Sequence, residues 1–281
     1  MLPIRGLTIY TARAAHQESH AIALAEGLKA HGIAATIRRD QVAATKHVAC
    51  WGWRVGRLLR RAGHEVLVME RGYIGDRFAW TSLGWNGLNG RAKFNPLDDP
   101  VRFNNHFSEL LKPWKEGGDY VLLIGQVPGD ASLGGMDMTR WYDESAKKAA
   151  KAYGLPVRFR PHPLARRDRS AVVRVEQIKG TLQEALARAA VVVTFNSNTA
   201  VESVLAGVPT VATDIGSMAA PVTSRQIGDV FKPDRFAWAA RLAWCQWTMA
   251  EIKAGVAWAA VQPRSLSEAC GDLEIAYTKG Q

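Results

Sequence analysis

Cysteine is scarce in this sequence, and its scarcity excludes two kinds of scaffold. The 281 residues contain only Cys50, Cys245 and Cys270. Three cysteines so far apart support neither a disulfide framework nor a zinc site. We therefore expect a protein of the reducing cytoplasm. We also expect no tightly bound metal.

The sequence also lacks long apolar runs and glycine-rich nucleotide motifs. No stretch approaches the roughly 20 apolar residues that cross a bilayer, and the first residues lead into an expected strand rather than a secretory signal. We therefore expect no transmembrane segment. The absence of GxGxxG and Walker loops leaves NAD and ATP chemistry without direct support. We detect no internal repeat.

Short apolar runs alternate with amphipathic stretches along the chain. A hydrophobic content of 47% is enough for one large core or two small ones. Alternation of this kind predicts parallel βαβ units. We expect an α/β fold divided into residues 1–115, residues 116–235 and a Trp-rich helical segment with a polar tail, 236–281. The expected strands are 7–11, 34–38, 47–53, 65–70, 119–124, 155–160 and 191–195.

The most informative stretch is 190–214, which predicts a strand, a polar loop, a short helix and a second strand. Its β-branched start is typical of a strand buried on both faces. The polar loop before the helix holds Asn196, Ser197, Asn198 and Thr199. Free N–H groups and the helix dipole favour an anion there, and Glu202, one turn later, can reach a ribose hydroxyl. An ordinary capped helix is the alternative.

Two other polar loops follow expected strands. One runs from Gly125 to Ser132, and the other contains His162 between two prolines, which restrict its backbone. In a doubly wound sheet, ligands bind at the carboxyl ends of the strands. We therefore expect the three loops to share one ligand. For His162, a rigid surface turn is the alternative.

Taken in order, the segments GQVPGDAS, RPHP and FNSNTAVESVLAGVPTV resemble the capsular-polysaccharide biosynthesis family of glycosyltransferases, which includes the Kdo transferases. The resemblance covers about residues 119–214 and rests on Gln126, Asp130, Ser132, His162, Pro163, Ser197 and Glu202. It implies a GT-B fold, in which two Rossmann-like halves with parallel sheets face a central cleft. Because this chain is short for that fold, both halves must be reduced in size.

The resemblance also implies which residues bind the nucleotide-sugar donor. The C-terminal half would hold it, with His162 and the Ser197 loop on the phosphate and Glu202 on the ribose. The predicted donor-binding set is Gln126, Asp130, Ser132, Arg160, His162, Ser197, Asn198, Thr199 and Glu202.

The stretch 71–94 combines five glycines, five aromatic residues and four positive charges with a single acid, Asp76. We expect a long functional loop here, with aromatic faces for sugars or bases and cations for phosphate. Asp76 is the candidate general base that removes the acceptor hydroxyl proton. Glu70 and His16 are its competitors, and pairing of Asp76 with Arg71 or Arg77 is the structural alternative.

Positive charge is in excess, with 36 Lys and Arg against 26 acids. Basic domains bind nucleic acid or anionic membrane surfaces. One cluster lies along an expected helix, where a solvated face is the alternative: Arg54, Arg57, Arg60 and Arg61. The other surrounds His162: Arg158, Arg160, Arg166, Arg167 and Arg169. The predicted acceptor-binding set is Arg57, Arg61, Arg71, Arg77, Trp80 and Trp85.

These features predict a glycosyltransferase that moves a sugar from a nucleotide-sugar donor to an acceptor hydroxyl. The favoured acceptor is a hydroxymethylated pyrimidine in DNA, as in phage enzymes that glycosylate their own genomes, so DNA is an expected partner. A glycan or lipid-linked saccharide is the alternative acceptor. A non-catalytic nucleic-acid-binding protein on a degenerate transferase fold is the third hypothesis. The sequence leaves the sugar, the nucleotide and the oligomeric state open.

Overall fold

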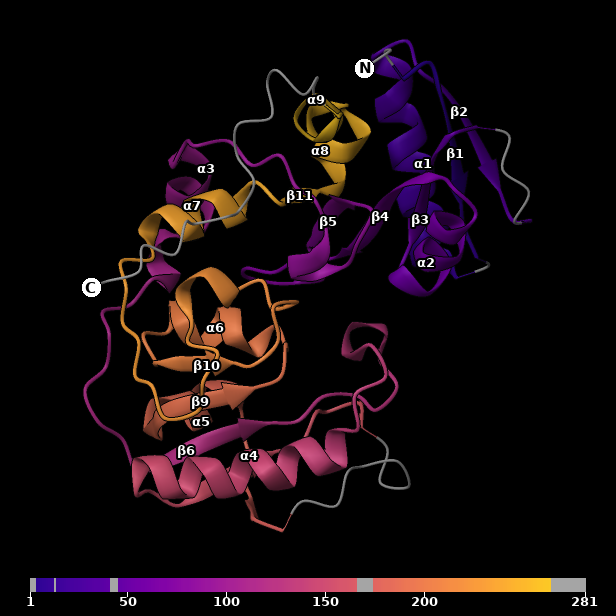
Figure 1. Cartoon of the computed structure of the whole chain (residues 1–281). Coiled ribbons are helices and arrows are strands. Elements are labelled where there is room, and N and C mark those ends of the chain that lie inside the picture. The colour runs from indigo at the N-terminus through magenta and orange to yellow at the C-terminus, as the bar shows by residue number, and fades with distance from the viewer. Residues whose placement is uncertain (1–3, 13, 41–44, 166–173, 264–281) are drawn as a thin grey trace, which may run out of the picture. The chain divides into compact units, whose positions relative to one another are not determined.

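The computed structural model describes residues 4–12, 14–40, 45–165 and 174–263 (Figure 1). They form two compact units, the first from the described residues of Met1–His106 and Ala240–Gln281 and the second from Phe107–Ala239. The expected boundary after residue 115 therefore falls inside the second unit. Most of the described C-terminal segment belongs to the first unit.

The first unit is built on a six-stranded sheet with the order β11-β5-β4-β3-β1-β2. The four strands β1 to β4 are parallel, β5 runs antiparallel to β4, and β11 runs antiparallel to β5. The strands are β1 (Gly6–Tyr10), β2 (Ala34–Arg38), β3 (His47–Trp51), β4 (Glu65–Arg71), β5 (Trp80–Trp85) and β11 (Gln246–Thr248).

Alternating side chains of this sheet enter two separate cores. Leu7, Ile9 and Leu67 pack with one set of helices, and Val48 and Val66 pack with Leu59 of α2 in another cluster. This alternation is what a parallel sheet covered by helices on both faces requires. The helices of the unit are α1 (Ala15–Ala30), α2 (Trp53–Arg61), α3 (Val101–His106), α8 (Met249–Lys253) and α9 (Val256–Val261), with a 3-10 turn at Asn89–Arg91; α7 (Phe236–Ala243) straddles the two units.

Strand β5 overturns the prediction of one long loop over 71–94. Its six residues are buried and pair with β4 and β11, and Nε1 of Trp85 donates to the Val261 carbonyl at 2.7 Å. Trp80 is only 9% exposed and Trp85 6%. Assigning Trp80 and Trp85 to an exposed acceptor-binding surface was therefore wrong, because both rings belong to the core of the first unit.

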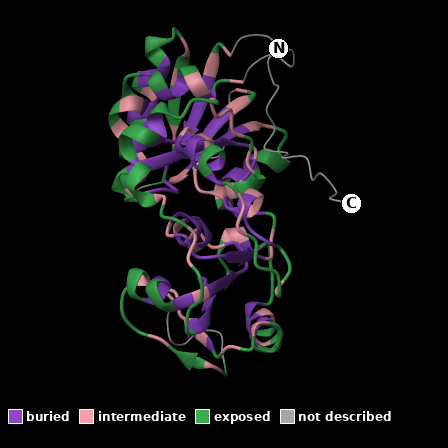
Figure 2. Cartoon of the chain, turned by 90° about the vertical axis from the view of Figure 1, so that its left-hand side faces the viewer, coloured by how far each residue is buried: buried purple, intermediate pink, exposed green. Residues whose placement is uncertain are grey.

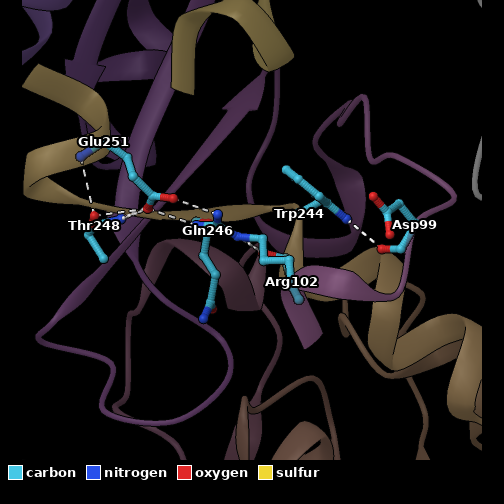
Figure 3. A network of polar contacts seen from close by, with 7 residues as sticks. Asp99, Arg102, Trp244, Gln246, Thr248 and Glu251 are labelled. Carbon is cyan, nitrogen blue, oxygen red and sulfur yellow. Dashed lines mark hydrogen bonds and ion pairs between the residues drawn. The ribbon is translucent and has the colours of Figure 1, made fainter. Parts of the chain in front are cut away.

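A buried arginine anchors the C-terminal segment to the first unit (Figure 3). Arg102 of α3 forms a bidentate ion pair with Glu251, with N–O distances of 2.6 and 2.8 Å. It also donates to the carbonyls of Ala243 and Gln246, each at 2.9 Å. Its guanidinium lies 4.4 Å from the ring centre of Trp247. Four of the five N–H donors of Arg102 are thus used, as burial of a charge demands.

The second unit contains a five-stranded sheet with the order β10-β9-β6-β7-β8, and all its pairings are parallel. The strands are β6 (Tyr120–Ile124), β7 (Val157–Arg160), β8 (Glu176–Gln177), β9 (Ala189–Thr194) and β10 (Thr210–Ala212). The helices are α4 (Met138–Tyr153), α5 (Leu182–Arg188) and α6 (Thr199–Leu205), with 3-10 turns at Ser108–Leu110, Ala131–Leu133 and Ala220–Val222.

Both faces of this second sheet are covered. Val121 and Leu123 pack with Tyr142 of α4, whereas Leu122 and Ile124 pack with Leu186 of α5. Most strands of both units are accordingly coloured as buried in Figure 2. The predicted α/β class is confirmed. Within the described ranges, no helix is long and apolar enough to cross a membrane.

Candidate functional site

The strand order of the second unit reverses at one point of its sheet. From β6 the chain proceeds to β7 and β8 on one side, and then to β9 and β10 on the other. In open parallel sheets, ligands bind outside the carboxyl ends of the strands at such a reversal. The loops after β6 and β9 therefore form the candidate ligand site of the second unit.

Two buried amides join these loops directly. Nε2 of Gln126 donates to Oδ1 of Asn196 at 2.8 Å, and the Asn196 backbone N–H donates to Oε1 of Gln126 at 3.1 Å. The backbone N–H of Gln126 in turn donates to the hydroxyl of Tyr142 on α4 at 2.7 Å. Because both amides are buried, this pairing holds the two loops in register.

Asn196 also connects two further loops. Its Nδ2 donates to the Ser132 carbonyl at 2.8 Å and to Oδ2 of Asp214 at 2.7 Å. Asp214, which follows β10, also accepts from the Gly216 N–H at 3.2 Å. Neither Asn196 nor Asp214 is in the predicted donor-binding set. Each is a polar residue that shortly follows a buried strand, and this position is the feature of the sequence that could have identified them.

Asp130 and Ser132 form a local cap. One carboxylate oxygen of Asp130 accepts from the Ser132 N–H at 2.8 Å and from its hydroxyl at 2.7 Å. Asp130 is exposed and Ser132 is half-buried. The pair shapes this turn, and Asn196 binds the carbonyl of Ser132 within it. These two predicted residues therefore lie beside the point where the strand order reverses.

His162 is brought to the same sheet edge by the close approach of β6 and β7. A Cβ on Gly125 would lie only 3.0 Å from the Arg160 carbonyl and 3.1 Å from the His162 nitrogen, so glycine permits this approach. The Leu164 N–H donates to Nδ1 of His162 at 3.1 Å. A neutral His162 ring therefore carries its proton on Nε2, which leaves Nε2–H as a donor.

The turn that begins α6 does not offer the free N–H groups expected from the sequence. The Ser197 N–H donates to the Thr194 hydroxyl at 3.3 Å, Thr199 N–H to the Ser197 hydroxyl at 3.2 Å, and Ala200 N–H to the Ser197 carbonyl at 3.0 Å. That prediction was wrong for these three groups, because the polar loop caps itself. Any ligand contact here falls to the half-buried side chains of Ser197, Asn198 and Thr199.

The remaining predicted donor residues lie on neighbouring elements. Glu202 is half-buried in the first turn of α6. Arg160 ends β7, and its guanidinium donates to the Gly180 carbonyl at 2.7 Å, before α5. Arg166, Arg167 and Arg169 lie outside the described residues, as do Cys270 and the tail after Pro263.

A second group of candidate side chains lies at the carboxyl ends of β3 and β4 in the first unit. The guanidinium of Arg71 lies 5.3 Å from the ring centre of Trp51 and 4.6 Å from that of Phe78, which is 76% exposed. The His16 and His20 rings meet Trp51 edge-on, with centroids 5.1 and 4.6 Å away. Arg71 therefore forms part of an exposed cation–aromatic stack.

The three candidate bases have different surroundings. Asp76 is exposed, and its Oδ1 accepts from the Phe78 N–H at 2.9 Å. Glu70 is half-buried at the end of β4. Burial of the Cys50 thiol, and then the negative charge of Glu70, raise the pKa of Cys50 to about 12. His16 lies at the start of α1. Arg77 donates to the Gly72 carbonyl at 2.8 Å.

No set of three or more histidine, cysteine, aspartate or glutamate side chains is arranged to hold a metal ion in the part of the chain that the structure describes. His20 is buried, and its Nε2 lies 2.8 Å from the Thr81 hydroxyl. Burial, and then the charge of Arg71, lower the pKa of His20, against an opposing hydrogen bond to the His16 carbonyl.

Comparison with known proteins identifies the fold. No protein-family model matches the sequence, and no curated protein is significantly similar to it. Two solved structures from Thermosulfurimonas dismutans are similar to this chain. One, KpsC, beta Kdo 2,7 transferase, has a TM-score of 0.56 at 16% identity and covers 84% of this chain and 89% of its own.

The second, KpsC, beta Kdo 2,4 transferase, has a TM-score of 0.59 at 15% identity, with 85% of this chain and 90% of its own covered. At such identities the likeness is one of fold. The predicted fold class is thereby confirmed: the chain has a GT-B-like α/β fold with two Rossmann-like units.

Proposed function

We propose that this protein is a glycosyltransferase that moves a sugar from a nucleotide-sugar donor to an acceptor hydroxyl. The observation that carries this proposal is the pairing of Gln126 with Asn196 at the strand-order reversal, with His162 at the neighbouring strand end. Polar side chains at this place of a Rossmann-like sheet are typical of a nucleotide site. Two solved proteins of similar fold are described as Kdo transferases.

The chemistry of the second unit suits a nucleotide phosphate and ribose. Nε2–H of His162 and the hydroxyl of Thr199 are donors for phosphate oxygens, and the Ser197 hydroxyl donates to Oγ1 of Thr199 at 3.3 Å. The carboxylate of Glu202 is an acceptor for ribose hydroxyls. As the bond between the anomeric carbon and the phosphate breaks, negative charge grows on the phosphate, and fixed donors there stabilise the transition state.

We assign acceptor activation to the carboxyl edge of the first unit's sheet. In an inverting transfer, a base removes the acceptor hydroxyl proton while that oxygen attacks the anomeric carbon and the nucleotide leaves. Asp76 is the proposed base, with Glu70 and His16 as alternatives. Arg71, stacked on Phe78, is available to an anionic group of the acceptor.

We propose a saccharide as the acceptor. The alternative, a hydroxymethylated pyrimidine in DNA, requires that the base be exposed or flipped, and Trp80 and Trp85, the aromatic residues of the predicted acceptor-binding set, are buried. The exposed ring of Phe78 offers an apolar face of the kind on which a sugar ring packs.

A ligand screen tests the donor site. Nucleotide sugars and free nucleotides are added singly, and the melting temperature is recorded, because a ligand that binds only the native state raises it. For the best ligand, calorimetry on His162→Ala and Glu202→Ala should show an affinity loss of about 10- to 150-fold, equivalent to roughly 1.5–3 kcal/mol. Glu109→Ala, an exposed acid of the same unit, is the matched control.

The proposal fails if no nucleotide or nucleotide sugar shifts the melting temperature of the folded protein. Once the donor is identified, transfer of its sugar to oligosaccharides and to hydroxymethylated DNA is compared by mass spectrometry of the acceptors. Transfer to the DNA alone would overturn the saccharide acceptor and leave the donor site intact.

A further inference from the structure

We propose that the outer face of α2 docks this protein on the surface of an anionic lipid bilayer. We call this surface the arginine face and define it as Arg54, Arg57, Leu58 and Arg61. It lies on α2 of the first unit, away from the strand ends that carry Arg71. Arg57 and Arg61 belong to the predicted acceptor-binding set, and we assign them to a bilayer instead. The proposal does not depend on the glycosyltransferase assignment.

The helix separates its two faces sharply. Gly56 and Leu59 are buried, and Leu59 packs with Val66 and Val68 of β4. On the other side, Arg54, Arg57 and Arg61 are exposed. None of the nine residues of α2 is acidic. The inner face therefore accounts for folding, and the outer one carries only positive charge around one apolar side chain.

Two charges of this face, those of Arg57 and Arg61, are poorly compensated within the described part of the chain. Arg60, beside it, donates to the His64 carbonyl at 3.1 Å and to Glu65 at 3.2 Å. Among the described residues, neither Arg57 nor Arg61 has a hydrogen bond or an ion pair with another side chain. These two cations thus remain available to an external anion.

The arrangement is unfavourable for the helix itself. Arg57 and Arg61 are four residues apart, a spacing at which like charges repel and destabilise a helix. Arg54 adds a positive charge to the first turn, where the helix dipole disfavours it. Local stability therefore does not explain this row of cations, whereas an opposing anionic surface would relieve the repulsion.

Leu58 distinguishes a bilayer from a nucleic acid as the partner. It is 49% exposed, and its position three residues before Arg61 and four after Arg54 places it between these cations on the same face. Apolar side chains flanked by arginines are typical of helices at a membrane interface, where the guanidinium groups meet lipid phosphates. A phosphate backbone would recruit the cations and leave Leu58 in water.

Binding through so small a surface must be mainly electrostatic. One helix with one exposed leucine buries little apolar area, so anionic headgroups supply most of the attraction. The net charge of +10 adds long-range attraction. We therefore expect reversible docking that weakens strongly as salt is raised to about 0.5 M, where charges are screened within a few ångströms.

Flotation with vesicles tests the proposal on the full chain without any sugar donor. The wild type should bind vesicles of phosphatidylglycerol mixed with phosphatidylcholine and should not bind phosphatidylcholine alone. Arg57→Gln combined with Arg61→Gln should lower the partition coefficient roughly 30-fold, from a contribution of about 1 kcal/mol per cation. Leu58→Ser, which keeps all the charge, should lower it several-fold.

The matched control is Lys147→Gln combined with Lys151→Gln on α4, which removes the same charge at the same spacing from exposed positions of the second unit. It should change vesicle binding little. The proposal is overturned if this control loses as much binding as the α2 variant, or if the wild type ignores anionic vesicles. Loss of duplex DNA binding in the α2 variant, with no vesicle binding by the wild type, would assign the face to nucleic acid instead.

Discussion

Gln126 and Asn196 exchange two hydrogen bonds across the point where the strand order of the second unit reverses, at 2.8 and 3.1 Å. Gln126 uses both ends of its side-chain amide, donating through Nε2 and accepting at Oε1, whereas Asn196 accepts at Oδ1 and donates through its backbone N–H. With its contacts to Ser132 and Asp214, Asn196 becomes the junction of the loops after β6, β9 and β10. The shape of the candidate donor site therefore depends on this one side chain.

Removing that junction should destabilise the second unit. Asn196→Ala removes the acceptor of Gln126 Nε2 and one donor to Asp214, which still accepts from the Gly216 N–H. An unpaired buried polar group costs about 1–3 kcal/mol. We expect the free energy of unfolding to fall by about 2 kcal/mol or more in urea titrations. Ser132→Ala keeps the carbonyl that Asn196 binds and should cost less than about 1 kcal/mol. Equal effects of the two variants would argue against the junction.

The identity of the base can be tested with shape-preserving variants. Asp76→Asn retains an oxygen that accepts from the Phe78 N–H but cannot take a proton. With the donor and acceptor that the screens under Proposed function identify, turnover should fall about 100-fold or more, while donor affinity is retained. Near-normal turnover in Asp76→Asn would remove Asp76 from the chemistry, and Glu70→Gln would then be the variant to measure.

The ion pair of Arg102 with Glu251 should contribute strongly to the stability of the first unit. Arg102→Met removes the cationic partner of Glu251, whose half-buried carboxylate keeps only its bonds from Thr248, and the Arg102 donors to two carbonyls. Breaking such a buried pair costs about 3–5 kcal/mol, which urea unfolding monitored by tryptophan fluorescence can detect. Arg140→Met, which breaks an exposed pair with Glu144, should cost less than about 1 kcal/mol.

Stability should also depend on pH through His20. Because burial lowers its pKa in the folded state, the unfolded chain binds more protons as the pH falls below about 6.5, the ordinary histidine value. The contribution of His20 is therefore present above pH 6.5 and is lost as the pH falls toward its lowered pKa. Burial also lowers the pKa of His47, so the two histidines share the effect.

Urea titrations at pH 7.5 and 5.5 measure this dependence. His20→Gln, whose amide can still reach the Thr81 hydroxyl, should show a smaller loss of stability between the two pH values than the wild type. An identical loss in both proteins would show that the proton is taken up elsewhere.

The parallel strands could be recognised from the sequence because their signal is local. A strand buried on both faces needs a continuous apolar run, as in residues 120–124 and 191–194, and these runs are β6 and most of β9. The polar loops that follow them also stand out, and Gln126 and His162 were among the residues expected there. The fold class and the location of the candidate donor site were therefore accessible from sequence.

Strand β5 was not accessible in this way, because its burial depends on distant partners. Ser82 pairs with Glu70 on one side and with Gln246, far along the chain, on the other. Read alone, its glycine-flanked aromatic residues look like a loop for ligands. The C-terminal segment packs on the first unit, where β11 pairs with β5, and this packing buries Trp80 and Trp85. It also brings Glu251 to Arg102.

The hydrogen-bond partners of polar residues were also decided by tertiary structure. The order of residues shows that Asn196 and Ser197 follow a buried strand. It does not specify that Ser197 caps its own turn or that Asn196 binds Gln126 and Asp214. A side-chain amide or hydroxyl can serve as donor or acceptor in many settings. Its partner is selected by which loops the sheet brings together, because a buried polar group must be satisfied by whatever lies within reach.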